Sequence, residues 1–153
     1  MRLLELKVPP VAVTVIFATA MFGMSKVTPA ATFTIPGSAG IAIGFAFFSV
    51  VITLAGVVAF RVNKTTVNPL NPGAASRVVS NGIYRYSRNP MYLGFLLALA
   101  AWAIYLSNAL AAWFLPAFVA YMNRFQIKPE ERTLLAKCGP VFSQYVAAVR
   151  RWV

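Results

Sequence analysis

The sequence predicts an all-α, polytopic integral membrane protein, a bundle of about four transmembrane helices followed by amphipathic helices at the cytoplasmic face. Hydrophobic residues make up 59% of the 153 residues, and the mean hydropathy is +0.71. Soluble domains are roughly half apolar. The apolar residues form long uncharged runs, and most charged residues fall between these runs. The length allows a single domain, with two transmembrane helices in residues 1–60 and the functional core in residues 61–153.

The charge and the composition exclude several classes of partner and cofactor. Fourteen Lys and Arg face three acidic residues, giving a net charge of +11. Nucleic-acid-binding proteins keep such charge on a solvated face and lack apolar runs of membrane length, so we expect lipid and no nucleic acid. The chain has no His, and its single cysteine is Cys138. We therefore expect no metal site and no intramolecular disulfide.

The first two spans precede the long polar connection. Val11–Ser25 is an uncharged run that follows two prolines, and Ala39–Phe60 is an uncharged run of 22 residues. Runs of roughly 17–25 apolar residues cross a bilayer as helices. Gly40 and Gly44 have the spacing that permits close approach of a second helix. The residues between the two runs, 26–38, are rich in Thr and Pro and predict a loop.

Residues 61–88 form a long basic connection, in which Asn68-Pro69 and Asn71-Pro72-Gly73 predict turns. Asn89 and Pro90 then predict a helix start, with Asn89 at the cap and Pro90 at the first helical position.

An apolar hairpin follows, formed by Met91–Leu106, a turn at Ser107-Asn108, and Ala109–Met122. Pro129 with its two following carboxylates predicts a new helix N-terminus, where acidic side chains are favoured. An amphipathic segment closes the chain.

The distribution of cations predicts the topology. Segments 1–8, 61–88 and 124–153 contain thirteen of the fourteen Lys and Arg, and only Lys26 lies on the other side of four spans. The positive-inside rule then places both termini in the cytoplasm. We expect the inner (plasma) membrane of a bacterium or archaeon. Residues 82–94 and 123–132 flank the hairpin and should therefore meet at one membrane face.

Two motifs on either side of the hairpin resemble a known family. They are Gly82-Ile-Tyr-Arg-Tyr-Ser-Arg-Asn-Pro-Met-Tyr-Leu-Gly94 and Pro129-Glu-Glu-Arg132, the latter continuing to Tyr145. Together they resemble the isoprenylcysteine carboxyl methyltransferases and, more distantly, the phospholipid N-methyltransferases. The resemblance covers residues 65–153, whereas the first two helices match only in being apolar.

The resemblance implies a cofactor-binding catalytic core in residues 61–153. S-adenosylmethionine, converted to S-adenosylhomocysteine, would bind at the cytoplasmic face beneath the C-terminal segment, and a lipophilic acceptor would enter from the bilayer. The motif positions imply a cofactor site formed by Gly82, Tyr84, Arg88, Asn89, Tyr92, Leu93, Glu130 and Glu131. Arg124 and Glu131 are the candidate catalytic residues.

Two positions depart from the family's pattern. Asn89 stands where relatives usually have His, and it cannot titrate. Gln126 stands where relatives often have Arg, while Arg124 lies two residues earlier and would face another side of a helix.

Other interpretations of the same residues stay open. The arginines and tyrosines of residues 82–94 also suit anchoring at lipid head groups. An NADPH-dependent reductase of the membrane sterol type is one alternative function, and a non-catalytic lipid-binding protein is another. The methyl acceptor is open as well: a prenylated cysteine, a phospholipid amine, a thiol or a quinone-like molecule.

Overall fold

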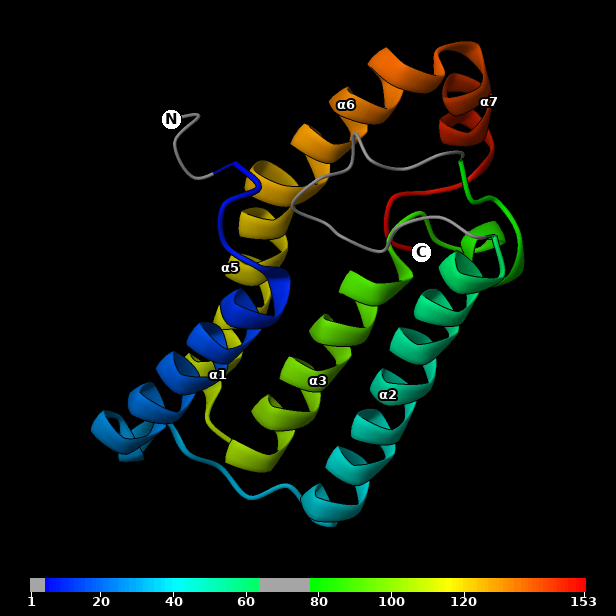
Figure 1. The fold of residues 1–153 in the computed structure, drawn as a ribbon. Helices are drawn as coiled ribbons and strands as arrows, with labels where there is room; N and C mark the ends of the chain where they lie inside the picture. Colours follow the sequence, from blue (N-terminus) through cyan, green and yellow to red (C-terminus); the bar gives the residue numbers. More distant parts are fainter. Residues whose placement is uncertain (1–4, 64–77) are drawn as a thin grey trace.

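The computed structural model describes residues 5–63 and 78–153, and the secondary structure in these residues is helical (Figure 1). Thr32 and Asn108 form an isolated β-bridge. The helices are α1 (Pro10–Val27), α2 (Ser38–Val62), α3 (Pro90–Leu106), α4 (Ala109–Ala112), α5 (Phe114–Tyr121), α6 (Lys128–Cys138) and α7 (Pro140–Ala148). The all-α prediction is confirmed. The turns predicted at Asn68-Pro69 and Asn71-Pro72-Gly73 lie outside the described residues.

Two of the predicted membrane helices are confirmed in length and composition. Within the described residues, α1 and α2 are long and apolar enough to cross a membrane, whereas α3 is a shorter apolar helix of 17 residues. Both begin and end within a few residues of the predicted runs. The structure therefore supports two spans on this criterion, and the total of four stays a prediction.

The outer surface of α2 is apolar. Ile43 and Phe47 are 69% and 65% exposed in the isolated chain. Contact of such side chains with water is unfavourable, since each buried large apolar side chain gains roughly 1.5–3 kcal/mol. A lipid environment removes this cost.

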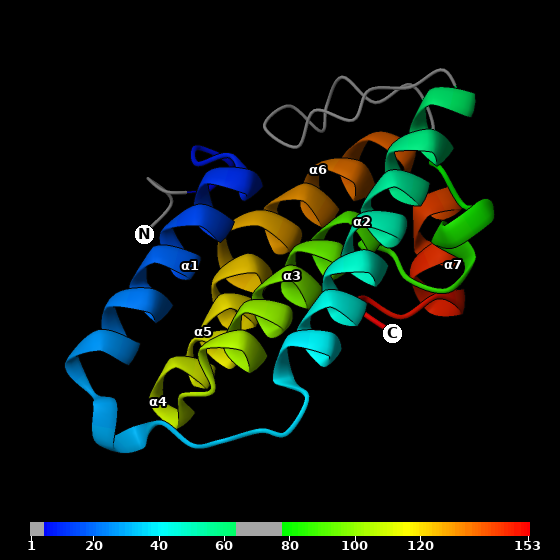
Figure 2. The ribbon, with the colours of Figure 1, turned by 90° about the horizontal axis from the view of Figure 1, so that it is seen from below.

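The most extensive helix contact is between α2 and α3, which run side by side (Figures 1 and 2). A Cβ built on Gly94 would lie 2.0 Å from the Thr53 hydroxyl oxygen and 3.0 Å from the Ser49 carbonyl oxygen. Among the described atoms, a Cβ on Gly40 or Gly44 would meet nothing within 4 Å. The predicted role of this glycine pair in helix approach is therefore wrong within the chain. The glycines at the contact of α2 with α3 are Gly56 and Gly94.

The buried core lies where α1, α3, α5 and the turn after α5 meet. Phe17 of α1 packs edge-on against Phe118 of α5, with ring centroids 5.4 Å apart. The fully or largely buried members of this cluster are Val13, Met21, Tyr92, Leu99, Ala103, Ala111, Phe118, Met122 and Ile127. Because Tyr92 belongs both to this core and to the motif of residues 82–94, the core fixes the position of that motif.

Asn108 organises the end of the bundle opposite to the chain termini. It is buried, and its Nδ2 donates to the Thr28 carbonyl oxygen at 2.9 Å. Its Oδ1 accepts from the Ala111 N–H at 3.0 Å and so caps α4. The Phe33 N–H donates to the carbonyl of Ser107, whose φ is +46°. The predicted turn at Ser107-Asn108 is confirmed, and it also anchors the loop between α1 and α2.

The second arm of the hairpin is interrupted at Trp113, between α4 and α5. Pro116 explains the interruption, because it has no N–H for the carbonyl of Ala112 and its ring crowds that carbonyl. This arm is therefore two short helices rather than the single run Ala109–Met122 that the sequence predicts.

The chain does not break between α5 and α6. A π-helical turn, Met122–Ile127, joins the two helices, and the Lys128 N–H bonds to the Asn123 carbonyl. Ile127 and Lys128 keep right-handed helical dihedral angles. The predicted helix start is confirmed, since α6 begins at Lys128 with Pro129, Glu130 and Glu131 in its first turn. However, the π-helical turn leads directly into α6, so Glu130 and Glu131 do not sit at an open helix end. Figure 1 shows α6 continuing from α5.

Replacement of Gly94 by Ala should push α2 and α3 apart. Overpacking of this kind typically costs about 1–3 kcal/mol. We expect Gly94→Ala to lower the thermal unfolding midpoint of the protein in detergent micelles. Gly44→Ala is the matched control, since its methyl group meets open space and Ala favours helix over Gly. Equal midpoints for the two variants would contradict the packing described here.

Candidate functional site

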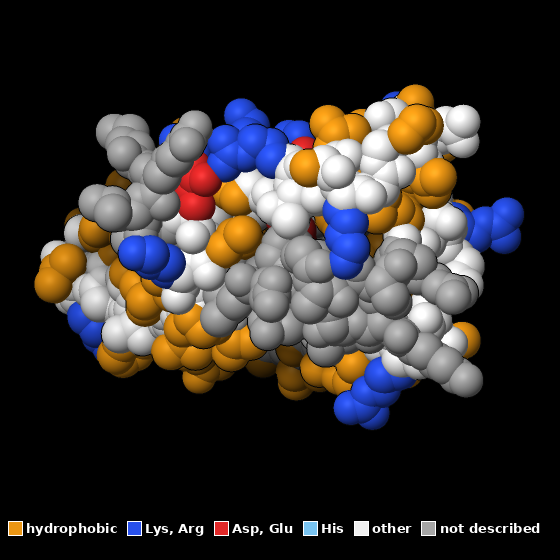
Figure 3. Space-filling view, turned by 45° about the horizontal axis from the view of Figure 1, so that its top comes forward, with side chains coloured by type: hydrophobic (Ala, Val, Ile, Leu, Met, Phe, Trp, Pro, Cys, Tyr) orange, Lys and Arg blue, Asp and Glu red, His pale blue; other side chains and the backbone are white. Residues whose placement is uncertain are grey.

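The polar segments gather at one end of the bundle, where both described ends of the chain lie (Figure 1). Residues 82–89, helices α6 and α7, the last residues of the chain and residues 5–8 meet there. In a view toward this end, Lys and Arg side chains are spread over the surface among apolar ones, and acidic side chains lie next to some of them (Figure 3).

The 3-10 turn Gly82–Arg85 positions the first part of the motif. Gly82 has φ +57°, a conformation that glycine adopts without strain. Tyr84 is buried and packs edge-on against Phe60 of α2, with centroids 5.2 Å apart. Its carbonyl accepts from the Tyr145 hydroxyl at 2.8 Å. Burial raises the pKa of Tyr84 well above its usual value and that of Tyr145 to about 12, so both phenols stay neutral.

The C-terminal residues lie against the start of α3. The Arg88 N–H donates to the Arg150 carbonyl at 3.0 Å, and the Asn89 Nδ2 donates to the Arg151 carbonyl at 2.8 Å. Pro90 begins α3 as predicted. Asn89 occupies the N-cap position as predicted, but its side chain makes no capping hydrogen bond to the described residues of α3. Its amide instead holds the C-terminal segment in place.

Tyr92 of α3 faces Glu130 of α6. The Tyr92 hydroxyl donates to the Glu130 Oε2 at 3.1 Å. Burial raises the pKa of Glu130 to about 7; the hydrogen bond from Tyr92 opposes this rise and the charge of Glu131 adds to it. Glu130 therefore changes charge near neutral pH. Leu93, the next residue, donates its N–H to the Asn89 carbonyl in the first turn of α3.

Glu131 joins three segments. Its Oε1 lies 3.0 Å from Nη2 of Arg88, and its Oε2 lies 2.7 Å from Nη2 of Arg151. Nε of Arg151 also donates to Oε1 at 3.1 Å, which makes this contact bidentate. The prediction that residues 82–94 and 123–132 meet is confirmed by these contacts and by the pair of Tyr92 and Glu130.

Arg124 forms its ion pair with a different carboxylate. Its Nη1 is 2.9 Å from Oε1 of Glu5, whose other oxygen pairs with Arg132. The two guanidinium groups lower the pKa of Glu5, with the hydrogen bond from Arg124 as the largest cause. Arg124 therefore pairs with Glu5, whereas Tyr92 and Glu130, with which the sequence groups it, pair with each other.

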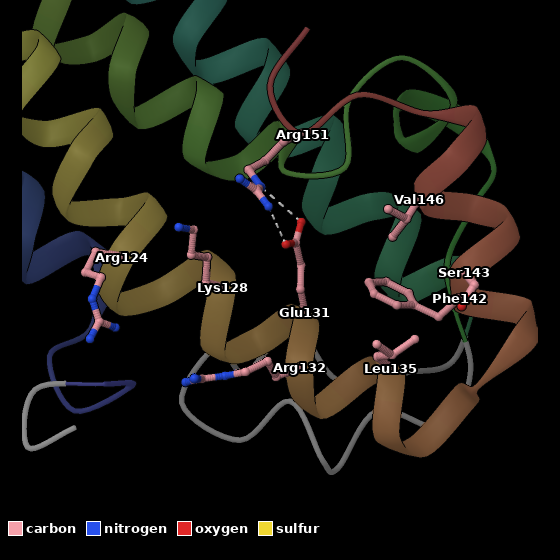
Figure 4. A pocket seen from close by; sticks show the side chains of 9 residues that line it. All are labelled: Arg124, Lys128, Glu131, Arg132, Leu135, Phe142, Ser143, Val146 and Arg151. Atoms are coloured by element: carbon pink, nitrogen blue, oxygen red, sulfur yellow. Dashed lines mark hydrogen bonds and ion pairs between the residues drawn. The ribbon is translucent and has the colours of Figure 1, made fainter. Parts of the chain in front are cut away.

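A pocket of about 650 Å³ opens between α6, α7 and the C-terminal residues (Figure 4). Its lining consists of Arg124, Lys128, Glu131, Arg132, Leu135, Phe142, Ser143, Val146 and Arg151. Of the predicted site residues, Arg124 and Glu131 line it. Of the other predicted residues, Glu130 lies on the side of α6 that faces α3. Tyr92 and Leu93 lie in the first turn of α3, and the remaining ones precede α3.

Several residues at this end were not predicted as site residues. Arg151 and Tyr145 hold the C-terminal segment, and Glu5 forms ion pairs with two arginines. One signal was present in the sequence: Glu5 is one of only three acids in a strongly basic chain, so an arginine partner was to be expected.

A family model described as phospholipid methyltransferase matches residues 37–138, about two thirds of the chain. The chain belongs to the phospholipid methyltransferase family. The match takes in α2, which the sequence motifs did not, and it ends with α6. The polar cluster on α3 and α6 thus lies within the part of the chain that is typical of a membrane methyltransferase.

The chain is also similar to an uncharacterized protein of Haemophilus influenzae. The two are 43% identical over 63 residues, which is 41% of this chain and the whole of that relative. No solved structure matches the chain.

The raised pKa of Glu130 predicts a pH-dependent stability. The folded state binds a proton more tightly than the unfolded chain, whose Glu titrates near 4.5. Stability from this group is therefore fully present below about pH 4.5 and declines as the pH rises to about 7. In the wild-type protein, we expect this group to lower the free energy of unfolding by about 1–3 kcal/mol as the pH rises, and Glu130→Gln should remove that decline. Thermal unfolding at pH 5 and pH 8 measures it, and parallel pH profiles for the two proteins would contradict the assignment.

Proposed function

We propose that the protein transfers a methyl group from S-adenosylmethionine to a lipophilic acceptor in the membrane, as an enzyme like the isoprenylcysteine carboxyl methyltransferases. The main support is the arrangement of Tyr92 with Glu130 beside Arg88 with Glu131, beneath the C-terminal segment. Membership of a methyltransferase family supports the reaction class.

The residues present fit the cofactor's charges. When bound, S-adenosylmethionine supplies a methyl group on a cationic sulfonium centre that is already activated for transfer. Glu130 and Glu131 are two of the chain's three acids, and both lie in this cluster. The buried Nε of Arg88 has no hydrogen-bond partner among the described residues, and it suits a carboxylate. Tyr92 offers an aromatic ring next to Glu130, and a ring face attracts cations.

Glu130 has the proton affinity that a general base needs. Its pKa of about 7 leaves a large fraction ionised at neutral pH while keeping it basic. An amine or thiol acceptor would lose its proton to such a carboxylate. A carboxylate acceptor needs no base, and positioning with exclusion of water would then supply most of the rate.

The proposed setting is a multi-pass inner-membrane protein with this end of the bundle in the cytoplasm. The apolar faces of α1 and α2 suit lipid, and the cations of segments 5–8, 82–88 and 124–153 collect at one end. The acceptor would reach the cluster from the bilayer. Membership of the phospholipid methyltransferase family favours this function over a sterol-type reductase.

Cofactor binding tests the proposal. We expect Tyr92→Ala and Glu131→Gln to weaken binding of S-adenosylmethionine at least about ten-fold, the effect of losing one hydrogen bond to a charged group. Isothermal titration calorimetry on the detergent-purified protein measures this. Tyr92→Phe separates the ring from the hydroxyl, since it keeps the aromatic face and loses the bond to Glu130.

Arg85→Gln is the matched control, because Arg85 is exposed on the 3-10 turn. The substitution removes one cation that lies outside the cluster. Thermal unfolding of each variant shows whether the fold is retained. Unchanged affinity in both folded test variants would refute the site. Binding of NADPH in place of S-adenosylmethionine would favour the reductase, and binding of neither would favour a non-catalytic lipid-binding protein.

A further inference from the structure

Residues 5–8 form a strap across the π-helical turn. The Leu6 N–H donates to the Phe125 carbonyl at 3.1 Å, and the Gln126 side chain donates to the Val8 carbonyl. Leu6 has φ +56°, which is unusual for a residue with a side chain. The strap thus holds a strained conformation while it presents Glu5 to Arg124 and Arg132.

The pocket beside the strap has a cationic part and an apolar part. Figure 4 shows Arg124, Lys128 and Arg132 on one side, while Leu135, Phe142 and Val146 lie together near the corner between α6 and α7. Leu135 is 49% exposed. Glu131 and Arg151 lie between the two parts and are paired with each other. Cations outnumber carboxylates in the lining, even when Glu5 is counted.

This arrangement fits an acidic amphiphile. Guanidinium groups bind phosphate and carboxylate oxygens strongly, and each oxygen of the Glu5 carboxylate already accepts a hydrogen bond from one of these two arginines, Arg124 and Arg132. The apolar part provides contacts for the first carbons of a hydrocarbon chain. Ligand pockets commonly measure about 300–1,000 Å³, and this one lies in that range.

We propose that this pocket binds the acidic head group of an amphiphile on Arg124 and Arg132, and that Glu5 occupies the same two arginines when the ligand is absent. Glu5 is thus an internal competitor. The pocket shares Glu131 with the proposed cofactor site, but its lining does not include Tyr92 or Glu130, and the two arginines proposed here are not part of the pair of Tyr92 and Glu130. It does not depend on the proposed function.

Binding of a short-chain probe tests this proposal. We expect dihexanoyl phosphatidic acid to bind the full-length protein in maltoside detergent, without S-adenosylmethionine, in a saturable calorimetric titration. Arg124→Gln and Arg132→Gln should each weaken binding about ten-fold, the loss expected for one charge-assisted contact. Arg85→Gln is the matched control and should leave the affinity unchanged.

The Glu5→Gln variant distinguishes competition by Glu5 from a structural role, because the two predict opposite changes in affinity for the probe. Loss of the competing carboxylate should tighten binding several-fold, whereas a purely structural role for Glu5 predicts weaker binding. Dihexanoyl phosphatidylcholine, which is zwitterionic, should bind much more weakly. Two further probes test the head group and the hydrocarbon chain. Binding of decanoate would support a site for acidic amphiphiles in general. Inorganic phosphate that binds as tightly as the lipid would show that the hydrocarbon chain contributes nothing, and this would overturn the proposal of an amphiphile site.

Three further results would overturn the proposal. One is an equal loss of affinity in Arg85→Gln and Arg132→Gln, which would indicate unspecific charge attraction. Another is weaker binding by folded Glu5→Gln protein. The third is displacement of the probe by S-adenosylhomocysteine with no effect of Glu5→Gln, which would assign this pocket to the cofactor.

Discussion

The polar end of the molecule depends on the two ion pairs that the carboxylate of Glu131 forms. It binds Arg88 from the segment before α3 and Arg151 from the C-terminal segment, and Glu131 itself belongs to α6. These groups are partly shielded from water, and an ion pair that loses one partner in such a setting costs more than an exposed pair. The backbone contact of Arg88 with Arg150 and the amide contact of Asn89 with Arg151 lie next to it.

The π-helical turn between α5 and α6 determines which way the two carboxylates point. A π turn accommodates an additional residue, and each residue of an α-helix turns the chain by about 100°. A regular α-helix through Met122–Ile127 would therefore direct the later side chains elsewhere. With the turn present, Glu130 faces Tyr92 while Glu131 faces Arg88 and Arg151. π turns are frequent at functional sites, and this one lies between the cluster and the strap of residues 5–8.

Adjacent carboxylates thus have different environments and suit different tasks. Glu131 is held by two guanidinium groups and has a structural role in closing the C-terminal segment. Glu130 has the Tyr92 hydroxyl as its neighbour and a pKa of about 7, so it is the better group to accept a proton. Carboxylates in contrasting environments are a common basis for divided roles in enzymes.

The sequence by itself determined the all-α class, the extents of α1 and α2, the start of α3 at Pro90 and the turn at Ser107-Asn108. These features follow from hydrophobic runs and from local proline and asparagine chemistry. It also brought the two motifs together, because a short hairpin returns the chain to the same end. Only the tertiary structure decided that α5 continues into α6, that Asn89 binds Arg151 and that Glu5 binds Arg124. Each of these depends on packing or on partners up to 119 residues away along the chain, which no local pattern encodes.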